Sequence, residues 1–182
     1  MKILETPLKD LVIIEPNVFE DARGYFMESY KQSVLEPSSG SFHIIQENES
    51  FSRRGALRGL HYQEGEYAQA KLVRVIEGEV LDIAVDLREN SPTFGAHFSV
   101  ELSSENKKQL FIPRGFAHAF VALEDNTIFQ YKVDNYYSGV KDGGVIWNDE
   151  ELAITWPEFE LELSEKDKNL PKLNQLDLNT LW

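Results

Sequence analysis

The sequence contains no cysteine. Disulfide bonds, thiolate metal sites and cysteine nucleophiles are therefore excluded, although a lack of cysteine favours a reducing compartment only weakly. Long apolar runs are also absent, since one of the longest, LVII at 11–14, is far shorter than the ~20 residues of a membrane-spanning helix. The first residues, MKILETPLKD, include acidic residues and a proline before a signal-type apolar region could form. We therefore expect a soluble, cytoplasmic protein with no secretory leader and no membrane anchor.

Positive charge is scarce, because 18 Lys and Arg residues stand against 31 Asp and Glu residues, for a formal charge of −13. Nucleic acids and anionic membranes need a clustered basic face, so neither is expected as a partner. Any anionic ligand must be small and held by a few local cations. The candidates are Arg23, Arg58, Lys71 and Lys166.

Helical periodicity is also scarce, whereas short β-rich runs separated by Gly, Pro, Asn and Asp recur from 11 to about 156. A chain of 182 residues suits one domain, 1–182. Evenly spaced antiparallel strands in a domain of this size predict a mainly β protein with a cupin-type jelly-roll barrel. The acidic tail, 157–182, is expected to form a short helical C-terminal cap on a barrel core of about 11–156.

The segment 71–87 predicts two strands flanking Glu77-Gly78, which is a plausible tight hairpin turn. In that register Lys71 and Asp82 fall on the same mostly apolar face. Further strands are expected at 97–102, 109–112, 117–123 and 127–133, with IPRGFAH forming a corner between two of them.

His61 lies in the stretch GALRGLHYQ, where a barrel metal site would place a second ligand two residues later. That position is Gln63, and although His118 remains available, His43 and His97 lie in other segments. A metal site is therefore weakly supported, and we expect none. His61 is then either a structural histidine or a proton acceptor.

Other polar residues have a structural and a functional interpretation. Lys71 on an inward face either pairs with Asp82 or acts as an electrophilic cation, because a buried ammonium without a partner or a task is disfavoured. Tyr131 shares a strand face with core residues, and Tyr137 at a loop edge could stack on a planar ligand. Asp167 ends Ser-Glu-Lys-Asp, a helix-capping pattern.

Together these residues supply a base, an acid, an electrophilic cation and anion-binding arginines, with no nucleophile and no cofactor motif. That inventory suits proton abstraction beside a carbonyl group.

Several motifs, in order and spacing, resemble the dTDP-4-dehydrorhamnose 3,5-epimerase family over about residues 3 to 173. They are FEDARGYFMES, ALRGLHYQ, KLVRVIEGEVLDIAVDLR, IPRGFAHAFVAL, YKVDNYYS, GGVIWNDEELAITWP and LSEKDKNLP. The resemblance implies a cofactor-free, cupin-like jelly roll, typically homodimeric, that acts on a dTDP-linked 4-keto-6-deoxy sugar in the pathway to dTDP-L-rhamnose. Alternatives are a relative that inverts only carbon 3 or carbon 5, or a sugar-binding barrel that has lost the reaction.

The resemblance also implies roles for individual residues. His61 would remove the proton at carbon 3 or 5, Asp167 would orient its imidazole, Lys71 would stabilise the enolate, and Tyr131 would return a proton from the opposite face. Tyr137 would stack on thymine. Contacts to the sugar or diphosphate would come from Arg23, Glu28, Gln46, Asn48, Arg58, His118, Asp142 and Lys166.

Three positions raise questions about this assignment. Glu47 stands where the family usually has Asp, and Asp142 stands where Glu is frequent, which changes the reach of the side chain and not its charge. Strict alternation sends Arg58 and His61 to opposite faces of a strand, unless Gly59 allows a bulge. Otherwise Arg58 must reach phosphates at the barrel rim or across a dimer interface.

Overall fold

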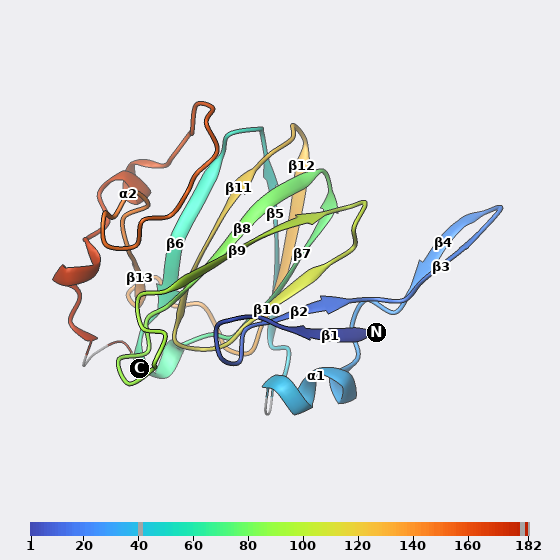
Figure 1. Ribbon diagram of the computed structural model, residues 1–182, viewed down its shortest axis with the longest axis horizontal. Helices are drawn as coiled ribbons and strands as arrows, with labels where there is room; N and C mark the ends of the chain where they lie inside the picture. Colours follow the sequence, from blue (N-terminus) through green and yellow to red (C-terminus); the bar gives the residue numbers. More distant parts are fainter. Residues whose placement is uncertain (40–41, 179–180, 182) are drawn as a thin grey trace.

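Two antiparallel sheets face each other in the computed structural model, which describes residues 1–39, 42–178 and 181 (Figure 1). The six-stranded sheet has the order β1 (Lys2–Glu5), β2 (Val12–Glu15), β10 (Gln109–Ile112), β7 (Lys71–Glu77), β12 (Thr127–Val133) and β5 (Gln46–Ser52). The five-stranded sheet has the order β13 (Asp142–Gly144), β6 (Leu57–Gln63), β11 (Phe116–Ala122), β8 (Glu79–Asp86) and β9 (His97–Ser103). The predicted mainly β jelly roll is confirmed.

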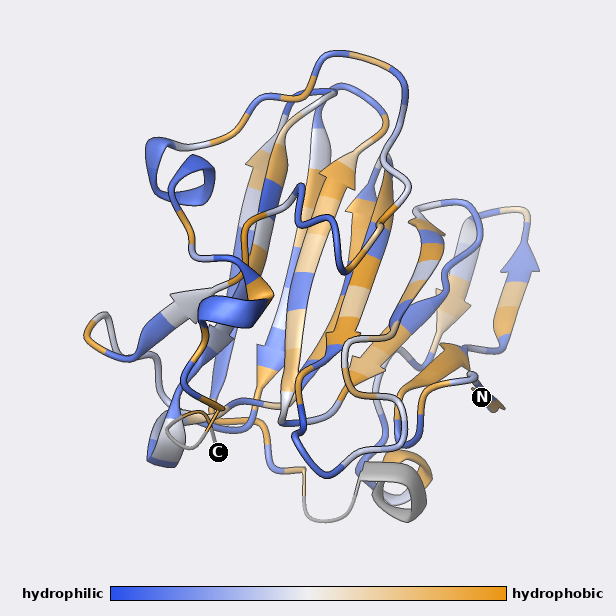
Figure 2. Cartoon of the chain, turned by 60° about the vertical axis from the view of Figure 1, so that its left-hand side comes forward, coloured by the Kyte–Doolittle hydropathy of each residue, from blue (hydrophilic) through white to orange (hydrophobic). Residues whose placement is uncertain are grey.

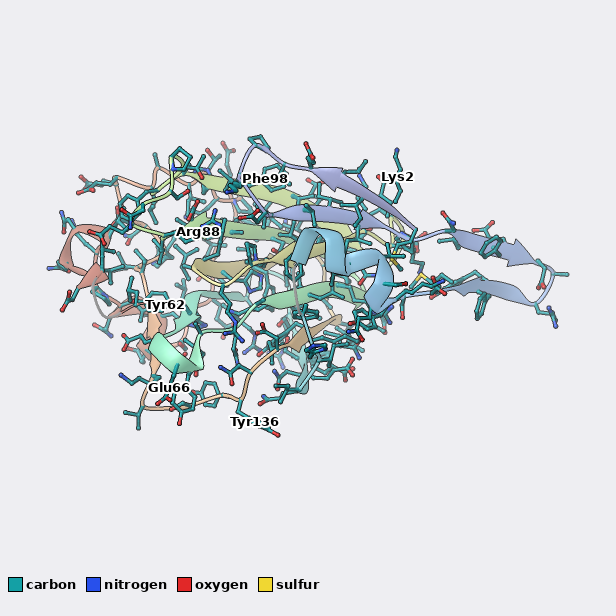
Figure 3. All side chains as sticks on the ribbon, turned by 90° about the horizontal axis from the view of Figure 1, so that it is seen from below. Lys2, Tyr62, Glu66, Arg88, Phe98 and Tyr136 are labelled. Atoms are coloured by element: carbon teal, nitrogen blue, oxygen red, sulfur yellow. The ribbon has the colours of Figure 1, made fainter. Side chains whose placement is uncertain are left out.

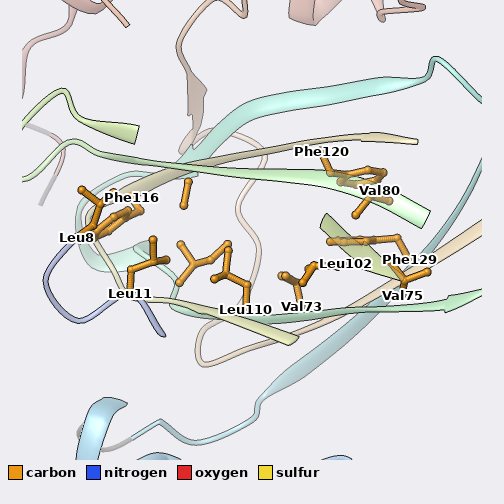
Figure 4. Close-up of a cluster of buried hydrophobic side chains, with 12 residues drawn as sticks. Leu8, Leu11, Val73, Val75, Val80, Leu102, Leu110, Phe116, Phe120 and Phe129 are labelled. Carbon is orange, nitrogen blue, oxygen red and sulfur yellow. The ribbon is translucent and has the colours of Figure 1, made fainter. Parts of the chain in front are cut away.

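The main hydrophobic core lies between the two sheets, and Figure 4 shows its side chains meeting there. Alternate residues of each strand point inward, as a sheet with one apolar face requires. Phe120 of β11 and Phe129 of β12 stack with ring centroids 4.1 Å apart and so join the sheets. Each buried side chain of this size contributes about 1.5–3 kcal/mol to stability.

The predicted hairpin at Glu77-Gly78 is wrong. β7 pairs with β10 and β12, whereas β8 pairs with β11 and β9, so the chain changes sheets at this turn. Gly78 has a φ of +79°, and a Cβ there would lie 2.4 Å from Thr127 Oγ1. Alternating residues look the same in a hairpin and in a corner between sheets, which explains the error. Lys71 and Asp82 therefore do not share one sheet face, although both strands contribute to the core between the sheets, where Val73 and Val80 belong to one cluster.

Two smaller apolar clusters cover the outer faces. On the six-stranded sheet, α1 (Gln32–Ser39) contributes Leu35, which joins Phe42 and Phe111. On the five-stranded sheet, the C-terminal segment contributes Leu173 and Leu181, and it carries α2 (Glu165–Lys168) and a 3-10 turn at Leu173–Gln175. Figure 2 shows hydrophobic residues in the strands of both sheets and hydrophilic residues in many of the connecting loops. The predicted C-terminal cap is therefore present.

One hairpin, formed by β3 (Val18–Asp21) and β4 (Gly24–Met27), projects away from both sheets (Figures 1 and 3). Its large apolar side chains are open to solvent, including Phe19 (63 % exposed) and Phe26 (70 % exposed). Apolar patches of this kind mark contact surfaces. In the described part of the chain, no helix is long and apolar enough to cross a membrane.

Candidate active site

A cavity of about 710 Å³ opens between the two sheets. Side chains from β5, β6, β7, β11 and β12 line it, and the segment around α2 closes one side. The sequence-predicted residues among its lining are Arg58, His61, Lys71, His118, Tyr131, Lys166 and Asp167. Residues far apart in the chain therefore meet at one concave site, the usual geometry of a small-molecule pocket.

His61 of β6 and Asp167 of α2 form a hydrogen-bonded pair, with 2.6 Å between Nε2 and Oδ1. Burial alone would raise the pKa of the Asp167 carboxyl, but the hydrogen bond and charge of His61 lower it below its ordinary value. Ser164 caps α2 by accepting from the backbone N–H of Asp167 at 3.1 Å. The capping pattern and the acid–base pair are thus both present. The cap fixes the backbone of Asp167, and the carboxylate of Asp167 in turn holds the imidazole of His61.

A bulge in β6 brings Arg58 and His61 to the same cavity. The pairing of β6 with β11 shifts register between His118 and Phe120, opposite Gly59. Gly59 has a φ of +133°, and a Cβ there would lie 2.4 Å from the Cβ of Ala119. Only glycine suits such a backbone position. The bulge that the sequence left open is therefore present, and it puts Arg58 and His61 on the same face of β6.

Arg58 occupies the rim of the cavity. Its guanidinium donates to the hydroxyl of Ser52 at 3.2 Å and to the backbone oxygen of Phe51 at 3.1 Å, both in β5. These bonds leave the charge unneutralised by any carboxylate in the described part of the chain. A guanidinium held in this way suits an anionic group entering from solvent.

Lys71 of β7 is buried, and its Nζ donates to the backbone oxygen of His61 at 3.4 Å. Burial lowers the pKa of Lys71 to about 8, against the opposing charges of Asp82 and Asp142. The side chain therefore still carries its charge at neutral pH. The simple ion pair with Asp82 is not formed, since Asp82 instead lies 2.9 Å from His118 Nε2.

Tyr131 reaches the cavity from β12, in the sheet opposite the one that carries His61. Burial raises the pKa of its phenol, and the charge of Asp142 raises it further, while Arg58 acts in the other direction. The phenol is consequently protonated at neutral pH. A protonated acid and a histidine thus face one cavity from two opposite sheets.

Asp142 of β13 is the centre of a polar cluster at the rim. It accepts hydrogen bonds from the ammonium of Lys166, the hydroxyl of Tyr137 at 2.9 Å and the amide of Gln63 at 3.2 Å. Gln63, the residue that stands where a metal ligand would be expected, therefore anchors this carboxylate. Among the described residues, no three His, Asp or Glu side chains gather closely enough to hold a metal ion.

Gln46 and Asn48 lie beside this cluster on the inward face of β5. Gln46 donates to Asn48 at 2.8 Å and accepts from the backbone N–H of Tyr137 at 3.3 Å. Glu47, between them, points to the outer face and pairs with Lys132. The departure from the family pattern at Glu47 therefore lies away from the cavity, whereas the one at Asp142 belongs to the site.

Six of the sequence-predicted binding residues do not line this cavity. Four of them form the polar cluster beside it, namely Gln46, Asn48, Tyr137 and Asp142, and the other two, Arg23 and Glu28, lie elsewhere in the chain. Arg23 lies in the turn of the projecting hairpin, where its side chain is 90 % exposed and pairs with Asp21 at 2.6 Å. Glu28 follows β4 and lies 3.6 Å from Lys31.

Sequence reasoning missed the pairing of Asp82 with His118, because the register of β8 against β11 cannot be seen in one sequence. It also missed that Ser50 and Ser52 of β5, with Glu162 and Leu163 before α2, line the cavity. Alternation along QENESFS could have placed the two serines on the inner face.

A jelly roll with a histidine–carboxylate pair, a buried ammonium and a protonated phenol around one cavity defines an acid–base isomerase. The profile of the family described as dTDP-4-dehydrorhamnose 3,5-epimerase matches residues 5–175. The chain belongs to this family and is therefore an epimerase.

Similar proteins agree. The dTDP-4-dehydrorhamnose 3,5-epimerase of Salmonella typhimurium is 51 % identical over 96 % of this chain and 97 % of its own. A crystal structure of the Elizabethkingia anophelis enzyme is 54 % identical with a TM-score of 0.91, covering 96 % of this chain and 97 % of that one. The Legionella pneumophila enzyme in complex with dTDP-4-keto-L-rhamnose is 43 % identical with a TM-score of 0.94, covering 99 % and 96 %.

Proposed function

We propose that this protein inverts carbons 3 and 5 of dTDP-4-dehydro-6-deoxy-D-glucose, giving dTDP-4-dehydro-L-rhamnose. The observation that carries the proposal is the placement of His61 and Tyr131 on opposite sheets of one cavity, with the ammonium of Lys71 buried beside them. Epimerisation needs a base on one face of a carbon, an acid on the other and a cation for the enolate oxygen. The family of the chain supports the same substrate class.

In the first half of the reaction, neutral His61 removes the proton from carbon 3, next to the 4-keto group. The electron pair of the C–H bond moves to the carbonyl oxygen, and Lys71 stabilises the resulting enolate. Asp167 holds the imidazole in place and balances the positive charge that it gains. General base catalysis of this kind contributes roughly 10²–10⁴-fold to the rate.

In the second half, Tyr131 donates its proton to carbon 3 from the opposite face, and the carbonyl re-forms. The centre is now inverted, while His61 holds one extra proton and Tyr131 lacks one. Exchange with solvent restores both groups, after which the same sequence inverts carbon 5. Both carbons are acidic for the same reason, since each adjoins the 4-keto group.

The rim supplies the contacts that hold the nucleotide. Tyr137 is 55 % exposed beside the cavity, and its ring can stack on thymine. Arg58 and Lys166 are the cations for the diphosphate, and Lys166 would exchange its contact with Asp142 for a phosphate oxygen. The sugar hydroxyl and keto groups would be bound by the remaining polar residues, Gln46, Asn48 and His118.

We further propose that the protein works as a homodimer in which the β3–β4 hairpin carries Arg23 to the partner's cavity. The exposed apolar side chains of the hairpin and its distance from its own sheets support this arrangement (Figure 3). A two-fold dimer would give both sites the same composition.

Mixed dimers test the exchange of Arg23. Arg23→Ala and His61→Ala should each be inactive or strongly impaired alone. When the two are mixed and allowed to exchange subunits, about half of the dimers hold both variants, and each has one intact site, so about a quarter of wild-type activity should return. If Arg23 served its own chain, mixing would restore nothing.

The reaction itself is tested by incubating the purified protein with dTDP-4-dehydro-6-deoxy-D-glucose and identifying the product by proton NMR. Ring coupling constants should show inversion at both carbons, and His61→Ala should abolish it. Inversion at one carbon would assign a mono-epimerase, and binding without inversion would leave only a sugar-binding barrel. Because nucleotide-activated sugars are made inside the cell, we expect the enzyme to act in the cytoplasm.

A further inference from the structure

Asp82 of β8 is fully buried behind the cavity wall and has a role in neither half of the reaction above. Its Oδ2 lies 2.9 Å from His118 Nε2, and its Oδ1 is buried without a hydrogen-bond partner. A buried carboxylate with an unpaired oxygen is strongly disfavoured unless a nearby charge compensates it.

His118 does not supply that charge. Burial lowers the pKa of His118 below its ordinary value, even though Asp82 acts in the opposite direction. At neutral pH the ring is therefore uncharged, and its Nε2–H donates to the carboxylate. The compensating cation must come from elsewhere in the cavity.

The elements around the cavity bring several other charged and titratable groups to the site that holds Lys71. They are Glu49 from β5, Arg58 and His61 from β6, Asp82 from β8, His118 from β11, Tyr131 from β12, Asp142 from β13, Glu162 before α2, and Lys166 and Asp167 from α2. Of the carboxylates, Asp167 is paired with His61, and Asp142 is paired with Lys166. Glu49 and Glu162 also line the cavity but are exposed to solvent. Asp82 is therefore the buried carboxylate around the described part of the cavity that pairs neither with a lysine or arginine nor with His61.

We propose that Asp82 is a positioning residue for the epimerisation, which holds the ring of His118 in place and keeps Lys71 in the ammonium form that the enolate requires. This inference rests on the proposed function, because it assigns the charge of Lys71 a task in that reaction. Asp82 acts through Lys71 and His118 and does not itself line the cavity.

The physical basis is the balance of forces on Lys71. Burial lowers its pKa to about 8, and Asp82 is the largest of the charges that act against burial. A nearby opposite charge typically raises the pKa of an ammonium by about one unit or more. Without Asp82, Lys71 would lose its proton within the working range of the enzyme.

The test is the pH dependence of kcat/KM for the isosteric variant Asp82→Asn, since kcat/KM reports groups of the free enzyme. The wild type should lose activity above about pH 8 as Lys71 deprotonates. In Asp82→Asn this alkaline limb should move down by about one pH unit, so that kcat/KM at pH 8 falls roughly fivefold beyond any uniform loss. An alkaline limb at the wild-type position would overturn the proposal.

A matched control lies four residues along the same strand. Asp86 is also fully buried, but it accepts from Arg88, Ser91 and Thr93. Asp86→Asn should reduce stability and leave the alkaline limb in place. If Asp86→Asn moved the limb as far as Asp82→Asn, loss of packing and not loss of charge would be the cause, and the proposal would fail.

NMR of lysine labelled with ¹³C and ¹⁵N measures the titration of Lys71 without turnover, and so separates this inference from the proposed function. The two can fail separately. If the wild type does not epimerise the substrate but Lys71 titrates at lower pH in Asp82→Asn than in the wild type, the proposed function is wrong and the charge coupling between Asp82 and Lys71 stands. If Asp82→Asn does not fold, Asp82→Ser is titrated in its place. A Lys71 ammonium that titrates about one unit lower than in the wild type supports the proposal, and one that titrates at the wild-type position contradicts it.

Discussion

Replacing Lys71 with methionine should stabilise the protein while removing its activity. Lys71 is buried, and its pKa falls from 10.5 to about 8 on folding, a difference of about 2.5 units. At about 1.36 kcal/mol per unit, the folded state carries a penalty of about 3 kcal/mol at pH 7 for holding the charge. Loss of the hydrogen bond from Nζ to His61 O offsets about 1 kcal/mol of the gain.

The net expectation for Lys71→Met is about 2 kcal/mol of added stability at pH 7, or a rise in Tm of about 4–8 °C for a chain of this size. The gain has a defined pH window. Below about pH 8, Lys71 is charged in both the folded and unfolded states, so the penalty is complete. Between about pH 8 and pH 10.5, Lys71 releases its proton in the folded state but keeps it in the unfolded state. The stability of the wild type therefore approaches that of Lys71→Met over this range. Above 10.5 the gain should vanish.

Urea unfolding of both proteins at pH 7 and pH 10.5 measures this window. Lys132→Met is the matched control, because Lys132 lies on the outer face of the neighbouring strand β12 and pairs there with Glu47. That change should alter stability by less than about 1 kcal/mol. The reasoning is refuted if Lys71→Met is less stable than the wild type at pH 7, or if its advantage persists unchanged at pH 10.5.

Three further substitutions follow from the same geometry. Gly59→Ala should lower the free energy of unfolding by more than about 2 kcal/mol, because the added Cβ would lie 2.4 Å from a side chain of β11. An unchanged Tm would contradict the tight bulge. Tyr131→Phe should lower formation of inverted product by roughly 10²–10⁴-fold, while solvent deuterium still enters the substrate on the His61 side; normal product formation would exclude Tyr131 as the acid. Asp142→Asn should raise KM severalfold because it weakens the hydrogen bond that holds Tyr137 at the nucleotide end of the cavity, whereas Glu47→Gln on the outer face should leave KM unchanged. Equal effects at the two positions would contradict this assignment.

The sequence alone was sufficient for the fold class and for the positions of the strands whose bounds it predicted, because alternating apolar residues and turn residues report local structure directly. β9, β10 and β12 begin at the expected residues 97, 109 and 127, and β11 at 116 in place of 117. The same patterns do not show which strand pairs with which. The corner at Gly78 was mistaken for a hairpin because both need a positive φ and both keep the alternation.

The candidate site was predictable where single residues carry a recognisable motif, as for His61 and Asp167. Its organisation was not, because contacts such as Asp82 with His118 depend on register across a sheet. Strict alternation would have separated Arg58 from His61, and only the bulge at Gly59 brings them together.

The measurement that bears most directly on the central claim is conversion of dTDP-4-dehydro-6-deoxy-D-glucose in D2O, followed by mass spectrometry and proton NMR of the product. A base and an acid on opposite faces of one cavity predict solvent deuterium at both carbon 3 and carbon 5, with both centres inverted, and no label with His61→Ala. Label at one carbon alone, or inversion without label at either, would contradict the account.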